Sequence, residues 1–228
     1  MMIIKHWSEL PQRPILTAGD CQLWMARLGD EDPDSFRGFL SEEERLRAGR
    51  LRSPRNADRF TISRGILRVL LSCYLACKPD QLVFSYGPNG KPELAGIFNK
   101  GLSFNISHSG GLVVFAIANG IEVGVDIEEI HSIGDLDVTA SIFLLSEEHV
   151  AFIALPDQMK LDRFFTSWTC NEAILKAHGT GFSGSARDVL VSFYQTTPKC
   201  DGENVNFKNK GLILFDPAEG FKGALVCI

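Results

Sequence analysis

The sequence lacks any apolar run long enough to cross a membrane, and its first residues, Met1–Trp7, contain no apolar core of signal-peptide length. We therefore expect a cytoplasmic protein with no membrane partner. None of the six cysteines forms a C-x-x-C pair, so we expect buried thiols and neither zinc ligands nor disulfides. The net charge of −5 argues against bulk binding of nucleic acid.

Sequence motifs of three common enzyme classes are missing or misplaced. No G-x-x-x-x-G-K-[ST] loop occurs, which excludes the ordinary nucleoside triphosphatase design, and no G-x-S-x-G segment supports a serine hydrolase. Gly179–Gly184 matches G-x-G-x-x-G, but a helix is expected before it and a strand after it. A dinucleotide-binding motif needs the reverse order. We interpret this segment as a glycine-rich helix end.

Four acidic and basic residues of the second half of the chain have a suggestive spacing. Asp126 and Glu128 alternate with apolar residues, which predicts a strand with both carboxylates on one face. Two such carboxylates repel each other unless a cation lies between them. Glu172, with Lys176 one turn later, lies on a predicted helix. An isolated D-x-E pair is usually solvated surface, but this combination predicts a magnesium site with a phosphate partner.

Candidate anion-binding groups lie in the first half. Between Arg45 and Arg68 there are eight arginines and no lysine, which fits either a solvated helix face or a cationic rim for a phosphorylated ligand or an acidic protein. Gly101–Gly111 is expected to form one turn that offers hydroxyl, histidine and backbone donors to an anion. Asn89–Pro92 is expected to be a turn that carries Lys91.

The chain also resembles itself. Four short segments recur in the same order at offsets of 104 to 108 residues, and a chain of 228 residues is long enough for one or two cores. We therefore expect an α+β fold of two pseudo-symmetric halves, residues 1–119 and 120–228, each with long helices on a mainly antiparallel sheet. The repeated pairs are Phe39–Glu43 and Leu144–Glu148, Asp58–Phe60 and Asp162–Phe164, Ile66–Arg68 and Ile174–Lys176, and Asp80–Ser85 and Asp188–Phe193.

Each half is expected to contain an opening strand, a short helix capped by Ser41 or Ser146, a long helix and further strands. The long helices are expected from Ser53-Pro54 towards Cys77 and from Met159 to His178. The predicted strands are Cys21–Leu28, Gln81–Tyr86, Leu102–Ile106 and Leu112–Asn119 in the first half, and Glu122–Glu128, Asp188–Tyr194, Leu212–Phe215 and Gly223–Ile228 in the second. A site that uses both the acids and the anion-binding groups must lie between the halves.

The ordered motifs resemble those of the 4′-phosphopantetheinyl transferases, and the length and the two halves resemble the Sfp-type branch, which works as a monomer. The resemblance implies transfer of phosphopantetheine from coenzyme A to a serine hydroxyl of an apo acyl or peptidyl carrier protein, with release of adenosine 3′,5′-bisphosphate. The motifs that carry it are Gly90-Lys-Pro92, Phe104–His108, Gly124–Glu128 and Trp168–Lys176.

The resemblance also implies roles for individual residues. Asp126, Glu128 and Glu172 would hold Mg²⁺ on the pyrophosphate of coenzyme A. Lys176 would lie near the bridging phosphate. The base that removes the serine proton would be Glu172, either directly or through metal-bound water, or Glu147 at the start of its helix.

The remaining implied roles are contacts to coenzyme A. Lys91, Ser107 and His108 would contact its phosphates and adenosine end, and Arg47 and Arg59 would lie on the side of the 3′-phosphate. Two alternatives stay open: a non-catalytic module that binds carrier protein or coenzyme A, and another Mg²⁺-dependent phosphotransferase.

One position departs from the family's pattern. Asn171 stands where a lysine usually precedes the helical glutamate. We expect position 171 to lie close to the pyrophosphate, where Asn171 can still donate a hydrogen bond.

Overall fold

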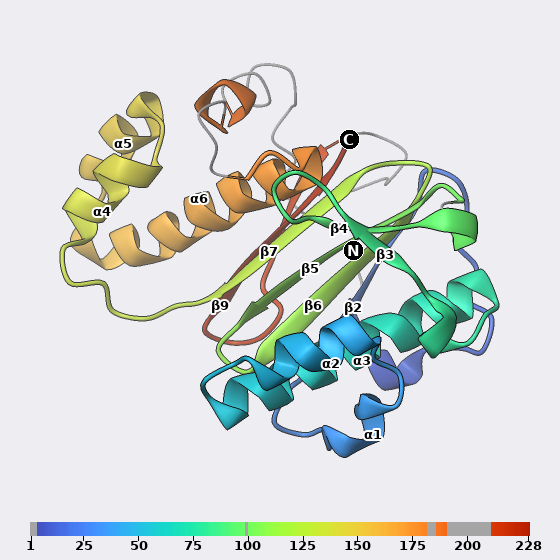
Figure 1. The fold of residues 1–228 in the computed structure, drawn as a ribbon. Helices are drawn as coiled ribbons and strands as arrows, with labels where there is room; N and C mark the ends of the chain where they lie inside the picture. The colour runs from blue at the N-terminus through green and yellow to red at the C-terminus, as the bar shows by residue number, and fades with distance from the viewer. Residues whose placement is uncertain (1–3, 99, 182–185, 191–210) are drawn as a thin grey trace.

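The computed structural model describes residues 4–98, 100–181, 186–190 and 211–228. The strands lie in the middle of the molecule, with the long helices α3 (Pro54–Leu75) and α6 (Asp157–His178) on opposite sides of them (Figure 1). The predicted α+β class is confirmed. No helix in the described part of the chain is long and apolar enough to cross a membrane.

Three strands of each sheet have the same topology. The first sheet has the strand order β1-β2-β6-β5 and the second the order β7-β9-β8, so β2-β6-β5 corresponds to β7-β9-β8 and β1 is an additional edge strand. All pairings are antiparallel except that of β1 with β2. The strands are β1 (Ile4–His6), β2 (Cys21–Arg27), β5 (Leu102–Ser109), β6 (Leu112–Asn119), β7 (Val123–Glu129), β8 (Gly211–Phe215) and β9 (Phe221–Cys227), with β3 (Phe84–Tyr86) and β4 (Pro92–Leu94) in a separate hairpin.

Short helices precede each long one. Ser41 caps α2 as predicted: its hydroxyl accepts from the Glu44 amide at 3.2 Å, and the Glu44 carboxylate accepts from the Ser41 amide at 2.9 Å. Such a cap contributes about 1 kcal/mol. The short helices are α1 (Asp34–Arg37), α2 (Glu42–Gly49), α4 (Leu136–Phe143) and α5 (Ser146–Ile153), with 3-10 turns at Trp7–Glu9, Pro79–Gln81 and Gly96–Phe98.

Several predicted boundaries are wrong. Ser146 is the first residue inside α5 and not its cap, because Leu145 precedes the helix and its amide bonds to Glu148. The strand expected at Asp188–Tyr194 is helical over residues 186–190, and residues 191–194 lie outside the described ranges. The expected turn at Gly101–Gly111 is occupied almost throughout by β5, which extends to Ser109.

The hydrophobic core continues from one half into the other. Leu23 and Val114 of the first sheet pack with Val125 and Leu225 of the second in one buried cluster. Each half also buries its long helix in a cluster of its own. This cluster includes Ile66 of α3 in the first half and Ile174 of α6 in the second. The described cysteines form no disulfide: Cys21, Cys170 and Cys227 are buried as predicted, and Cys73 and Cys77 are partly buried. Cys200 lies outside the described residues.

Candidate functional site

Helix α6 packs directly on β7 because Gly124 has no side chain. A Cβ atom there would lie 2.1 Å from the carbonyl oxygen of Ala173 and 2.3 Å from the backbone nitrogen of Ala177. Only glycine permits this contact between the backbones of a strand and a helix. The close approach brings the charged residues of α6 beside the carboxylates of β7.

Asp126 is the buried centre of this group, with 3% of its surface exposed. Its Oδ1 atom accepts from Lys176 Nζ at 2.6 Å and from Ser107 Oγ at 2.8 Å. Lys176 Nζ also lies 3.2 Å from Ser107 Oγ. Burial raises the pKa of Asp126, while the Lys176 ammonium and the Ser107 hydroxyl act in the opposite direction.

Burial also affects the other two acids, Glu128 and Glu172. Burial raises the pKa of Glu128; the hydrogen bond from Ser109 opposes this, and the charge of Asp126 adds to it. Burial also raises the pKa of Glu172, which Lys176 lowers and the charges of Asp126 and Glu128 raise further. Three carboxylates that disfavour one another's ionisation would be relieved by a cation.

The residues fit a magnesium ion in their donor chemistry. Asp126 Oδ2 is buried and has no hydrogen-bond partner among the described residues. Carboxylate oxygens are the ligands that Mg²⁺ prefers. As the side chains stand, no group of three His, Cys, Asp or Glu residues in the described ranges is already arranged around a metal position. The Lys176 ammonium instead pairs with Asp126.

The edge strands β5 and β7 of the two sheets lie side by side (Figure 1). Side chains join them. Three polar side chains of β5 accept backbone N–H groups of β7, at residue numbers that rise together, so the strands run parallel. The pairs are Asn105 with Val125 at 3.0 Å, Ser107 with Ile127 at 3.2 Å and Ser109 with Glu129 at 3.0 Å. The side chains replace the backbone ladder of a continuous sheet.

His108 points away from this junction because side chains alternate along a strand. It lines a cavity of about 460 Å³ together with Arg47 and Arg59. The Arg47 guanidinium lies over the Phe60 ring at 5.3 Å. Three of the residues expected on the adenosine side of coenzyme A therefore share one cavity, while Ser107 faces the acids.

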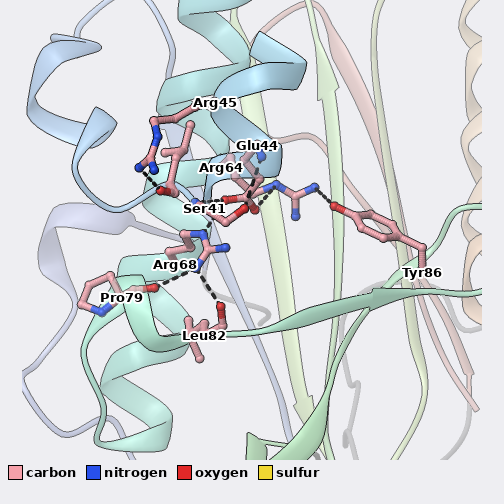
Figure 2. A network of polar contacts seen from close by, with 9 residues as sticks. Ser41, Glu44, Arg45, Arg64, Arg68, Pro79, Leu82 and Tyr86 are labelled. Atoms are coloured by element: carbon pink, nitrogen blue, oxygen red, sulfur yellow. Dashed lines mark hydrogen bonds and ion pairs between the residues drawn. The ribbon is translucent and has the colours of Figure 1, made fainter. Parts of the chain in front are cut away.

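Arg64 and Arg68 form a buried network, although Arg64 also lines the cavity with Arg47 and Arg59. Both point to the buried carboxylate of Glu44 (Figure 2): Arg68 Nε lies 2.7 Å from one oxygen and Arg64 Nε 3.3 Å from the other. Arg68 also donates to the carbonyls of Pro79 and Leu82, at 2.9 Å and 3.0 Å. The rim interpretation of the arginine-rich segment is wrong for Arg68, which is buried away from the cavity, and stays a prediction for Arg64.

Lys91 is bound to the second half. Its ammonium donates to Glu122 at 2.9 Å, to the carbonyl of Ala177 at 3.1 Å and to that of Val123 at 3.4 Å. Ala177 lies in the last turn of α6, where a cation is favourable. In this structure the contacts of Lys91 hold the two halves together, and its expected phosphate contact stays a prediction.

Two residues lie apart from the acids. Glu147 is exposed on α5 and makes no hydrogen bond or ion pair within the described part of the chain. Asn171 is buried and its amide lies 3.4 Å from the Phe143 carbonyl at the end of α4. The expectation that position 171 faces the pyrophosphate is therefore not met, because the side chain is used in packing α6 against α4.

The sequence analysis missed three residues that shape the site: Gly124, Ser109 and Glu44. Gly124 could have been suspected, since a glycine inside an apolar strand indicates a close backbone approach. Ser109 could also have been found, because polar residues at every second position of β5 match the period of the two acids on β7. Glu44 was assigned to the capping box of α2, and its sequence position gave no sign that it also pairs with Arg64 and Arg68.

Comparisons with known proteins agree with this architecture. A profile described as the 4′-phosphopantetheinyl transferase superfamily matches residues 122–208, and one described as the N-terminal part of 4′-phosphopantetheinyl transferase matches residues 32–119. The 4′-phosphopantetheinyl transferase HetI of Nostoc sp. is 36% identical over 202 residues, which cover 86% of this chain and 84% of that protein.

Two further relatives show the same similarity. A putative 4′-phosphopantetheinyl transferase of Synechocystis sp. is 32% identical, over 80% of this chain and 76% of its own length. The 4′-phosphopantetheinyl transferase Sfp of Bacillus subtilis is 28% identical, over 74% of this chain and 73% of its own. The chain thus belongs to the 4′-phosphopantetheinyl transferase superfamily, as an enzyme of its Sfp type.

Proposed function

We propose that this enzyme transfers 4′-phosphopantetheine from coenzyme A to a serine hydroxyl of an apo acyl or peptidyl carrier protein, in a Mg²⁺-dependent reaction that releases adenosine 3′,5′-bisphosphate. The observation that carries the proposal is that consecutive residues of β5 face two different parts of the site, the acids and the arginine-lined cavity. Ser107 and Ser109 bond to the acids, and His108 between them lines the cavity with Arg47 and Arg59. One ligand with anionic groups at both ends can therefore cross the edge of this strand.

The reaction makes one bond to phosphorus and breaks another. The serine oxygen bonds to the phosphorus that carries pantetheine. The bond from that phosphorus to the bridging oxygen breaks, and its electron pair leaves with adenosine 3′,5′-bisphosphate. The serine proton passes to a base. Catalysis then depends on positioning and on stabilising the negative charge that develops on the leaving group.

Asp126, Glu128 and Glu172 would hold the magnesium ion. When bound, it would neutralise the charge of the pyrophosphate. Lys176 is suited to the leaving group, because an ammonium has three N–H donors and Asp126 and Ser107 take two of them. The third can be offered to the bridging oxygen. Arg47 and Arg59 would bind the 3′-phosphate, beside His108.

Glu172 is the better candidate for the base. Burial raises its pKa, which makes its carboxylate more basic, and it lies among the acids of the site. Glu147 is exposed on α5. We expect Glu172→Gln to abolish transfer and Glu147→Gln to leave it within about twofold of wild type. The opposite result would assign the base to Glu147.

All parts of the proposed site come from one chain, so the enzyme is proposed to act as a cytoplasmic monomer. The test is to incubate it with coenzyme A, Mg²⁺ and an apo carrier protein and to weigh the carrier by intact mass spectrometry. The expected result is a gain of one phosphopantetheine group, lost when EDTA is added. A carrier of unchanged mass would contradict the transfer, and a gain that survives EDTA would contradict the metal.

A further inference from the structure

Ser107 and Ser109 share two kinds of hydrogen bond, two residues apart, and Ser107 Oγ accepts a further one from Lys176 Nζ at 3.2 Å. Ser107 Oγ donates to Asp126 at 2.8 Å and accepts from the Ile127 amide at 3.2 Å. Ser109 Oγ donates to Glu128 at 2.7 Å and accepts from the Glu129 amide at 3.0 Å. Each hydroxyl therefore joins one carboxylate of β7 to the amide of the residue that follows it.

This double bonding fixes the direction of each hydroxyl proton. A serine hydroxyl has one proton to donate, and the backbone N–H of β7 takes one of its lone pairs. The proton is thereby directed to the carboxylate, and one oxygen of each acid is held at β5. We propose that Ser109 is a positioning residue that orients Glu128 as a metal ligand, just as Ser107 orients Asp126.

The acids need such support because of where they lie. They project from the same face of one strand, and like charges so close would turn the side chains apart. Asp126 has Lys176 as a second partner, whereas Glu128 forms no ion pair within the described residues. Glu128 also accepts a hydrogen bond from the Trp168 side chain, which carries no charge. Removing Ser109 should therefore leave Glu128 with this neutral partner, and its carboxylate should turn away from Asp126 more easily. Partners of this kind commonly change metal affinity 10- to 100-fold when they are lost.

The chain offers a matched control. Ser103 lies on the same strand, and its hydroxyl donates to the backbone carbonyl of Ile121 at 2.5 Å. Ser103→Ala also removes a hydroxyl bond between the halves but touches no acid, whereas Ser109→Ala removes one bond to an acid and one to a backbone amide. Ser109→Thr keeps a hydroxyl at the same position and suits a strand. A purely structural role predicts equal effects of the two alanine variants.

The inference rests on the proposed function, so the wild-type protein is measured first. Mn²⁺ binding is followed by electron paramagnetic resonance in the presence of coenzyme A, and the melting temperature is recorded for every variant. We expect Ser109→Ala to weaken Mn²⁺ binding about tenfold, and Ser109→Thr and Ser103→Ala to stay within about twofold of wild type. The concentration of Mg²⁺ that gives half-maximal transfer should rise by a similar factor in Ser109→Ala.

Each outcome decides a separate point. If the wild type transfers phosphopantetheine and binds Mn²⁺ but Ser109→Ala binds it equally well, the positioning role is wrong and the proposed function stands. If Ser103→Ala weakens Mn²⁺ binding as much as Ser109→Ala, the effect comes from the junction of the halves and the inference also fails. If the wild type binds no metal and transfers nothing, the proposed function and the inference fail together.

Discussion

The two halves place a basic residue at the same point of the repeat and use it differently. Arg68 in α3 and Lys176 in α6 correspond in helices of 22 residues each. Arg68 is 1% exposed and pairs with Glu44 of its own half. The Lys176 side chain is 28% exposed and pairs with Asp126 beside Ser107 of the other half.

This difference shows how one fold supports two tasks. The planar guanidinium of Arg68 has five donors in a fixed arrangement, which suits a buried network with a carboxylate and two carbonyls. The Lys176 ammonium is a compact charge on a flexible stem at the boundary of the halves, where it can reach a ligand. Arg68 therefore serves the stability of the first half, and Lys176 lies at the candidate site of the second.

The largest effect is expected from Asp126→Ala, which removes the carboxylate at the centre of the site. Transfer should fall about 10,000-fold, or about 5 kcal/mol of transition-state stabilisation. The melting temperature should change by only a few degrees, because partly exposed Lys176 can turn to water. Mass spectrometry of the carrier and thermal unfolding measure the two effects. Glu219→Ala, at an exposed acid of the same half, is the control.

If Asp126→Ala kept the transfer rate and the Mg²⁺ dependence of the wild type, the proposed metal site in the second half would be wrong. Arg68 and Lys176 would then differ only in how exposed their side chains are.

Glu44→Ala should act on stability. It leaves Arg64 and Arg68 as buried charges without their carboxylate, a change that costs about 3–5 kcal/mol. Urea unfolding measures this loss. Ser41→Ala removes only the cap and should cost about 1 kcal/mol. Equal losses in the two variants would mean that the ion pairs add nothing beyond the cap.

Gly124→Ala and Gly65→Ala compare the packing of the two long helices. A Cβ at Gly124 meets the backbone of α6, while one at Gly65 lies 2.4 Å from Cβ of Phe36. Each should cost about 1–3 kcal/mol of stability. Only Gly124→Ala displaces α6, so it alone should slow transfer, by up to about 100-fold. Similar transfer rates per folded molecule would show that the position of α6 is not critical.

Local patterns predicted much of the fold. β6 has the predicted bounds because its residues are apolar up to the final Asn119, and the cap of α2 followed from Ser41 and Glu44 three residues apart. The acids on one face of β7 followed from the period of two. The turn expected at Ser107 and His108 was wrong, because polar residues on β5 serve a neighbouring strand that no local pattern reveals.

Long-range partners explain the remaining differences. The place of Lys176 near phosphate stays a prediction, but its pairing with Asp126, 50 positions away, was not predicted. Arg68 looked like part of a basic surface, and only the packing of α2 on α3 shows that Glu44, 24 positions away, neutralises it. Spacing along one helix or strand predicts which residues share a face. It does not predict which face of another element meets them.

The smallest effect is expected at Lys91. This substitution tests whether Lys91 stabilises the contact between the halves or binds coenzyme A. Lys91→Met removes the ion pair to exposed Glu122 and the bonds to the carbonyls of Val123 and Ala177. Exposed ion pairs contribute little, so the loss should be about 1 kcal/mol, and Glu122→Gln should cost less than about 0.5 kcal/mol. The KM for coenzyme A should rise less than about threefold. A tenfold rise in KM with unchanged stability would show that Lys91 leaves these carbonyls to bind phosphate, and the first half would then contribute directly to the site.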